Sequence, residues 1–153
     1  MKVYLAGSMA GGRAFAGSLR EINDLLINLG HNVLTPFVVD EKINQIRFPK
    51  LKGVNRARAI FKQDLELVTK ADVIIAEVSQ PSIGVGIELG FAAGLIRLAG
   101  KAKPILLLRH RSLENERNSN LVLGNPYATF LYYDKESIEG VITNFFQKIK
   151  KKI

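Results

Sequence analysis

The chain has 153 residues, a net charge of +8, no cysteine and only two histidines, His31 and His110. These counts exclude a disulfide framework, a thiolate zinc site and a cysteine nucleophile, and neither histidine belongs to a metal-ligand motif. No apolar run approaches the roughly 18 residues of a membrane span, so we expect one cytoplasmic domain over residues 1–153.

The excess positive charge gathers in residues 47–62 and 148–152. Such charge would fit a nucleic-acid partner, but no helix-turn-helix, zinc-finger or RNA-binding signature accompanies it. The terminal lysines follow an amphipathic helix, and cations favour the C-terminal end of a helix. We therefore interpret the basic residues as a solvated face and expect no nucleic-acid partner. Attraction of a phosphorylated substrate is the functional alternative.

Strand-like and helix-like patterns alternate along the chain. Short apolar runs bounded by turn residues indicate buried strands, and apolar residues at helical spacing indicate amphipathic helices. In chain order the predicted elements are a strand over 2–6, a helix over 14–29, a strand over 31–37, a helix over 57–70, a strand over 73–76, a helix that opens near residue 87, a strand over 104–108, a strand over 129–133 and a helix over 136–150. This order predicts an α/β domain with a parallel sheet.

Two long connections lack such patterns. Residues 40–55 are basic and without periodicity, and Pro49 and Gly53 punctuate them, so they are predicted to form a loop. Residues 109–125 are polar and mixed, with a helical turn expected near residues 118–123.

Two polar turns follow strands of the predicted sheet. The first spans residues 7–13 and matches neither a P-loop nor a G-x-G-x-x-G loop. In the second, Pro81 ends the strand, while Gly84 and Gly86 let the backbone approach a ligand. Both turns are expected at the carboxyl edge of the sheet, where open α/β sheets bind anionic or polar ligands.

Two carboxylates accompany these turns. Glu88 is expected in the first turn of a helix, where it either complements the helix dipole or faces the ligand. Asp64 falls among apolar residues of the helix over 57–70, where it is a surface residue, a cap for a neighbouring loop or a second carboxylate of the site. Two carboxylates facing one pocket suit glycosidic chemistry, because one can attack the anomeric carbon while the other protonates the leaving group.

Four stretches of the chain together resemble the nucleoside 2-deoxyribosyltransferase family. They are residues 4–8 (YLAGS), residues 11–13 (GGR), residues 61–66 (FKQDLE) and residues 71–90 (ADVIIAEVSQPSIGVGIELG), of which the last is the most specific. The branch with the greatest similarity is that of the 2'-deoxynucleoside 5'-monophosphate N-hydrolases. The resemblance implies a flavodoxin-like, Rossmann-like three-layer sandwich with a five-stranded parallel sheet. It also implies a homodimer whose active sites are shared between subunits.

The resemblance also implies roles for individual residues. Glu88 matches the nucleophile that attacks C1' of the deoxyribose, Asp64 the acid that protonates the departing base, and Tyr4 the residue that orients the nucleophile. Ser119 and Asn120 match a segment donated by the neighbouring subunit. Contacts to the sugar and the 5' phosphate are implied or expected for a further set: Gly7, Ser8, Gly11, Gly12, Arg13, Ser82 and Gly84.

Two residues depart from the pattern of this branch. Ala10 stands where the branch carries a basic residue, which removes a bidentate contact to phosphate. Arg13 is a candidate substitute, and an unphosphorylated nucleoside is the alternative substrate. Phe37 stands where related chains often carry a polar residue, so the preferred base stays open.

The sequence thus predicts an enzyme that cleaves or transfers the N-glycosidic bond of a 2'-deoxyribonucleoside or its 5' monophosphate. The reaction is expected to pass through a covalent glycosyl-enzyme intermediate and to need no metal or organic cofactor. The alternative is a nucleotide-binding or sensing module that has the same pocket without turnover.

Overall fold

A single parallel sheet organises the computed structural model, which describes residues 1–9 and 14–151. Its strand order, β2-β1-β3-β4-β5, is that of flavodoxin-like doubly wound sheets, and every neighbouring pair is parallel. The predicted fold class is therefore confirmed. The strands are β1 (Lys2–Ala6), β2 (Asn32–Val33), β3 (Val73–Glu77), β4 (Ile105–His110) and β5 (Ala128–Tyr133).

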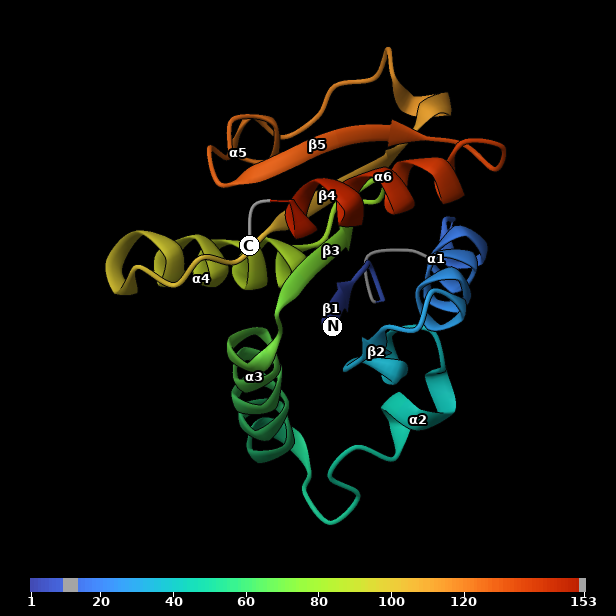
Figure 1. Cartoon of the computed structure of the whole chain (residues 1–153). Coiled ribbons are helices and arrows are strands. Elements are labelled where there is room, and N and C mark those ends of the chain that lie inside the picture. Colours follow the sequence, from blue (N-terminus) through green and yellow to red (C-terminus); the bar gives the residue numbers. More distant parts are fainter. Residues whose placement is uncertain (10–13, 152–153) are drawn as a thin grey trace.

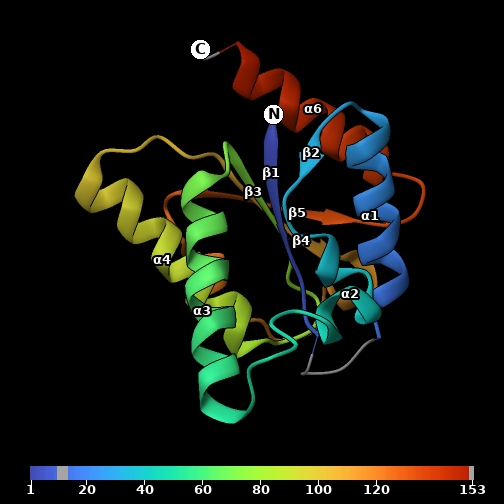
Figure 2. The same cartoon turned by 90° about the horizontal axis from the view of Figure 1, so that it is seen from below.

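Helices cover both faces of this sheet, as Figures 1 and 2 show. One apolar core lies between the sheet and the pair α1 and α6, and a second core lies between the sheet and the pair α3 and α4. Two shorter helices lie in the connections. The helices are α1 (Ala16–Asn28), α2 (Glu41–Gln45), α3 (Gly53–Lys70), α4 (Ile83–Ala99), α5 (Asn120–Leu123) and α6 (Ile138–Lys150).

The alternation of side chains along β1 directs one polar group towards α3 and α4. Val3 and Leu5 belong to the core beneath α1 and α6, whereas Tyr4 and Ala6 belong to the core beneath α3 and α4. Successive side chains of a strand point to opposite faces, so this division follows directly from the sequence. Tyr4 consequently brings a phenol to the face where Asp64 and Glu88 are carried.

Strand β2 is shorter than the predicted strand over 31–37, because a 3₁₀ helix at Pro36–Val38 ends it. Pro36 favours this helix, since its fixed φ suits a first helical position and it lacks an N–H for a ladder. Thr35 completes the edge of the sheet instead. Its Oγ1 accepts a hydrogen bond from the N–H of Leu5 (3.1 Å) and donates one to the carbonyl oxygen of Leu5 (2.7 Å).

The segment over 40–55 is not simply a loop, so that prediction is wrong for part of it. Asp40 caps the short helix α2 by accepting from the N–H groups of Lys42 (2.8 Å) and Ile43 (3.3 Å). Arg56 of α3 then donates to the carbonyl oxygens of Arg47 (3.1 Å) and Asn44 (3.0 Å). The Arg56 side chain thus holds the backbone of this segment in place. Such contacts leave no periodic pattern in the sequence, so the sequence did not predict them.

The connection after β4 also differs from its prediction. The strand continues through His110, so Arg109 belongs to the sheet and not to the polar segment. The helical turn expected near 118–123 is confirmed as α5.

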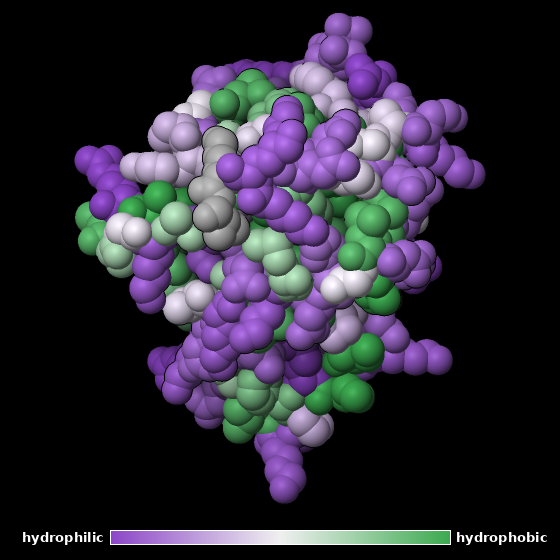
Figure 3. All heavy atoms as spheres, in the orientation of Figure 1, coloured by the Kyte–Doolittle hydropathy of each residue, from purple (hydrophilic) through white to green (hydrophobic). Residues whose placement is uncertain are grey.

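The most exposed of the large apolar side chains lie on α4 and α5. They are Leu121 (88% exposed), Ile83 (85%) and Leu98 (85%). Figure 3 shows a face covered mostly by hydrophilic side chains, with hydrophobic atoms in separate patches, one of them at the left where Figure 1 places α4. Across residues 1–9 and 14–151, no helix is both long and apolar enough to cross a bilayer.

Candidate active site

Helix α4 carries Glu88 one turn further from its start than the sequence predicts. Ser82 caps the helix, because its Oγ accepts from the N–H of Val85 at 3.4 Å, and the helix begins at Ile83 rather than near residue 87. Glu88 is therefore the sixth residue of α4, and no acidic residue occupies the first turn. Since the dipole effect fades beyond the first turn, a simple dipole partner does not explain Glu88.

Tyr4 and Glu88 are hydrogen-bonded to each other through their side chains. Tyr4 is only 2% exposed. Burial raises the pKa of Tyr4 far above its usual value, and the nearby charges of Glu88 and Asp64 raise this pKa further. The phenol therefore stays protonated at any physiological pH and acts as the donor to the carboxylate.

Asp64 lies on α3 and forms an ion pair with Arg47. Both side chains are mostly buried, with 17% of Asp64 and 7% of Arg47 exposed. Arg47 is held from two further sides: its Nε donates to Oε1 of Gln63 (2.9 Å), and its Cζ lies 3.7 Å from the ring centroid of Phe37. This cation–π contact fixes the guanidinium over the site.

Sequence reasoning missed Arg47. It is one of many basic residues in the stretch over 47–62, and nothing in their spacing separates it from the solvated ones. The ring of Phe37 provides the surface on which the Arg47 guanidinium rests.

These four side chains form one electrostatic cluster. Burial raises the pKa of Glu88 to about 7, the hydrogen bond from Tyr4 lowers it, the charge of Asp64 raises it and that of Arg47 lowers it. Burial also raises the pKa of Asp64, opposed by the hydrogen bond and charge of Arg47. The cluster thus holds two carboxyl groups in different environments, which is the arrangement needed for divided acid and nucleophile roles.

The turn after β1 is only partly described. Gly7 packs closely on α1, because a Cβ at this position would lie 2.6 Å from Cδ2 of Leu19 and would require that side chain to shift. Ser8 follows it with a buried Oγ that has no partner among the described residues. Three predicted binding residues, Gly11, Gly12 and Arg13, lie outside the described residues, as does Ala10.

Three of the four other predicted binding residues line one cavity. Ser82, Ser119 and Asn120 line a cavity of about 820 Å³ that lies between α4 and α5. Gly84 is exposed in the first turn of α4 but is not a lining residue. Since Glu88, Asp64 and Tyr4 do not line this cavity either, one chain presents a carboxylate cluster and a separate cavity, both adjoining α4.

Comparison with known proteins decides the family. A family model described as nucleoside 2-deoxyribosyltransferase matches residues 3–124. The chain belongs to this family. The match extends from β1 through α5 and so includes both the carboxylate cluster and the cavity.

Two relatives of this family member are named as N-hydrolases. The 5-hydroxymethyl-dUMP N-hydrolase of Danio rerio is 31% identical over 99% of this chain and 99% of its own. A protein of Thermofilum pendens, with the assigned name 2'-deoxynucleoside 5'-phosphate N-hydrolase 1, is 38% identical over 85% of this chain and 82% of its own.

Two solved structures share the fold. A 2-deoxyribosyltransferase from Bacillus psychrosaccharolyticus aligns with a TM-score of 0.62 and 22% identity over 90% of this chain and 96% of its own. A CMP N-glycosidase from Clostridium botulinum aligns with a TM-score of 0.58 and 20% identity over 98% and 99% of the two chains. With the family match, these relatives identify an enzyme that cleaves or transfers N-glycosidic bonds.

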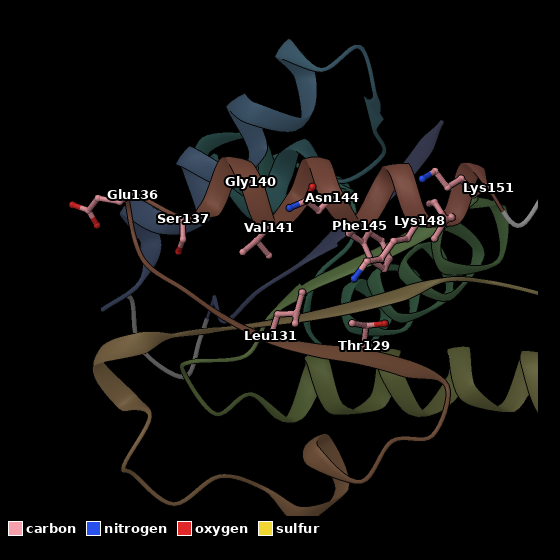
Figure 4. Close-up of a pocket in the computed structure, with 11 residues that line it drawn as sticks. Thr129, Leu131, Glu136, Ser137, Gly140, Val141, Asn144, Phe145, Lys148 and Lys151 are labelled. Carbon is pink, nitrogen blue, oxygen red and sulfur yellow. The ribbon is translucent and has the colours of Figure 1, made fainter.

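A second hollow, of about 790 Å³, lies between α6 and β5 (Figure 4). Leu131 of β5 and Val141 and Phe145 of α6 line it, with Lys148 towards one end. Among the described residues that line it, Glu136 is the only carboxylate, so they offer no pair for glycosidic chemistry. Throughout the described ranges, no three histidine, aspartate or glutamate side chains lie together as a metal site.

Proposed function

We propose that the protein hydrolyses the N-glycosidic bond of 2'-deoxyribonucleoside 5'-monophosphates, with Glu88 as nucleophile and Asp64 as acid and base. The observation that carries this proposal is the cluster of Tyr4, Glu88, Asp64 and Arg47, in which each carboxyl group has a different partner. The names of the relatives support a deoxynucleotide substrate and water as the acceptor.

In the first step a carboxylate oxygen of Glu88 attacks C1' of the deoxyribose. The C1'–N bond breaks, its electron pair passes to the base, and Asp64 supplies the proton that the departing base takes up. The product is an ester between the sugar and Glu88. Tyr4 keeps the carboxylate turned towards C1', because its hydroxyl remains a donor throughout.

In the second step water attacks C1' and releases the Glu88 carboxylate. Asp64, now ionised, accepts a proton from this water, which restores the enzyme. Burial favours the protonated form of Asp64 needed in the first step, while Arg47 favours the ionised form needed in the second. These opposed influences suit a group that must lose and regain one proton in each turnover.

A homodimer with shared sites completes this proposal. Ile83, Ile87 and Leu98 expose an apolar face of α4, and Leu121 extends it on α5. Such a face is suited to burial against a second copy. Ser119 and Asn120 are exposed beside it, where they are available to the site of a partner subunit. A cytoplasmic location stays a prediction.

The test is release of free base from a panel of deoxynucleosides, ribonucleosides and their 5' monophosphates, followed by chromatography. We expect release from 2'-deoxyribonucleoside monophosphates, because a sugar without the electron-withdrawing 2' hydroxyl reaches an oxocarbenium-like transition state more easily. Preference for ribonucleotides would contradict the deoxy assignment. Tight binding of deoxynucleotides without any base release would favour a binding or sensing module.

A further inference from the structure

Arg109 is a buried arginine in the sheet. It lies on β4, and only 3% of its surface is exposed. Ile105 and Leu107 belong to the core beneath α3 and α4, so the alternation of the strand directs Arg109 to that same face. A charged side chain in such a position needs a partner, because an isolated buried charge is strongly unfavourable.

The partners that Arg109 has are uncharged. Its Nη2 donates to the carbonyl oxygens of Glu116 (3.2 Å) and Arg117 (3.3 Å), while its buried Nε has no hydrogen-bond partner in residues 1–9 and 14–151. Within the part of the chain that the structure describes, no carboxylate forms an ion pair with this guanidinium. Arg47, by contrast, is paired with Asp64. Arg109 is thus a buried positive charge for which the described residues supply no anion.

Arg109 is one of the residues that line the cavity between α4 and α5. Ser82 lines the same cavity, as does Asn118, whose buried Nδ2 also lacks a partner among the described residues. No aspartate or glutamate is among the lining residues, but a second arginine, Arg117, is. The N-terminus of the 17-residue helix α4 opens onto the cavity through Ser82 and Ile83, and helix N-termini favour anions.

We infer that Arg109 binds the 5' phosphate of the substrate, with the Asn118 amide and the start of α4 as further donors. This inference rests on the proposed function, since it assigns the phosphate of the same nucleotide to the cavity. Ser82 and Glu88 are six positions apart, roughly 9 Å along a helix axis. A deoxyribose whose phosphate lies at the cavity can therefore present C1' towards Glu88.

This assignment also accounts for Ala10. The family resemblance implies a basic residue at that position, where this chain has alanine. The Arg109 guanidinium, which lies on β4, would replace the contact to phosphate that a basic residue at position 10 would make. The bidentate geometry of a guanidinium matches two phosphate oxygens, which a lysine ammonium does not.

The decisive experiment compares kcat/KM for a deoxynucleoside and for its 5' monophosphate. Arg109→Gln is expected to lower the value for the monophosphate by about 10- to 100-fold and to change that for the free nucleoside by less than about twofold. Arg111→Gln is the matched control, because it removes the same charge two residues away, where Arg111 pairs with Glu114 and Asp134 outside the cavity. An undiminished monophosphate preference in Arg109→Gln, or equal losses on both substrates, would overturn the inference.

Arg109 also holds the loop at Glu116 and Arg117, so a conservative variant guards against a folding defect. Arg109→Lys retains the positive charge but removes the paired N–H donors of the guanidinium. It is expected to fold and to show a smaller, still selective loss on the monophosphate. A wild-type monophosphate preference in Arg109→Lys would count against a bidentate contact.

A binding measurement separates this inference from the proposed function. Inorganic phosphate, added against chloride at matched ionic strength, is expected to raise the Tm of the wild type and to have a much smaller effect on Arg109→Gln. If the wild type cleaves neither substrate but shows this difference, the proposed function fails and the phosphate site stands. If phosphate raises both Tm values equally, Arg109 is not its ligand.

Discussion

The hydroxyl of Tyr4, at the centre of the sheet, donates a hydrogen bond to the Glu88 carboxylate in the second turn of α4. The phenol is buried and its pKa is raised, so it remains a donor at physiological pH. The bond fixes the direction of the carboxylate and opposes the rise in pKa that burial causes. Turnover should therefore depend on pH through Glu88.

For a free deoxynucleoside, kcat/KM should fall as the pH drops below about 7. Glu88 attacks only as a carboxylate, and burial raises its pKa to about 7, so acid removes the reactive form. Tyr4→Phe removes a hydrogen bond that lowers this pKa and should move the midpoint to higher pH. An unphosphorylated substrate is used because a phosphate monoester titrates near pH 6 itself. Activity that rises towards acid would instead assign Glu88 as the proton donor.

Glu88→Gln should lower base release by roughly 10³-fold or more, because the amide retains the shape but not the nucleophilic charge. Circular dichroism and Tm should show that the fold is retained. Glu66→Gln makes the same chemical change at an exposed position of α3 and should keep wild-type activity. Rapid turnover by Glu88→Gln would exclude Glu88 as the nucleophile.

Asp64→Asn should affect poor leaving groups more than good ones. A natural base needs protonation as it departs, whereas a nitrophenolate leaves readily as an anion. The ratio of wild-type to variant kcat/KM should therefore be larger for a deoxynucleoside than for a nitrophenyl deoxyriboside. Equal ratios for the two substrates would show that Asp64 shapes the site without donating a proton.

Arg47→Gln should lower the free energy of unfolding at neutral pH by about 1–3 kcal/mol, because it leaves the largely buried carboxylate of Asp64 without its charged partner. Urea denaturation measures this change. The difference from wild type should shrink in acid, where Asp64 is protonated in both proteins. Arg58→Gln removes an exposed charge from α3 and should change stability by less than about 0.5 kcal/mol. Similar losses in the two variants would argue against a structural role for the Arg47–Asp64 pair.

If the active sites are shared between subunits, two inactive variants should complement each other. Glu88→Gln lacks the nucleophile and Ser119→Ala lacks a side chain that we assign to the partner's site. Mixed dimers of the two should regain one intact site, so mixing should restore part of the wild-type rate. Size-exclusion chromatography with light scattering gives the mass. A fully active monomer at micromolar concentration would refute the dimer.

The sequence predicted the fold well because its strands are apolar runs separated by clear turns. The order of strands follows from the family resemblance, and it brings Tyr4, Asp64 and Glu88 together from three elements. The convergence of Asp64 and Glu88 was expected from their places beside the carboxyl edge of the sheet, and that of Tyr4 from the family resemblance. Their catalytic roles stay predictions.

Other features depend on contacts that leave no pattern in the sequence. Arg47 lies in the site because its guanidinium packs on Phe37 and its carbonyl oxygen accepts a hydrogen bond from Arg56. Neither contact produces a repeating pattern of residues that could be recognised in the sequence. Arg109 was placed in a polar connection because charged residues seldom lie in strands buried on both faces. Its position in β4 became apparent only from the pairing of Arg109 with Tyr132 of β5.

Thr35 is the last residue before the segment over 36–52, and it contacts β1 through its side chain. Because its Oγ1 satisfies both the N–H and the carbonyl oxygen of Leu5, β1 needs no further backbone neighbour on that edge. The register of the sheet is therefore independent of the length and composition of the segment that brings Phe37 and Arg47 to the site. Evolution can exchange that segment, and with it the partner of Asp64, while the scaffold that holds Tyr4 stays unchanged.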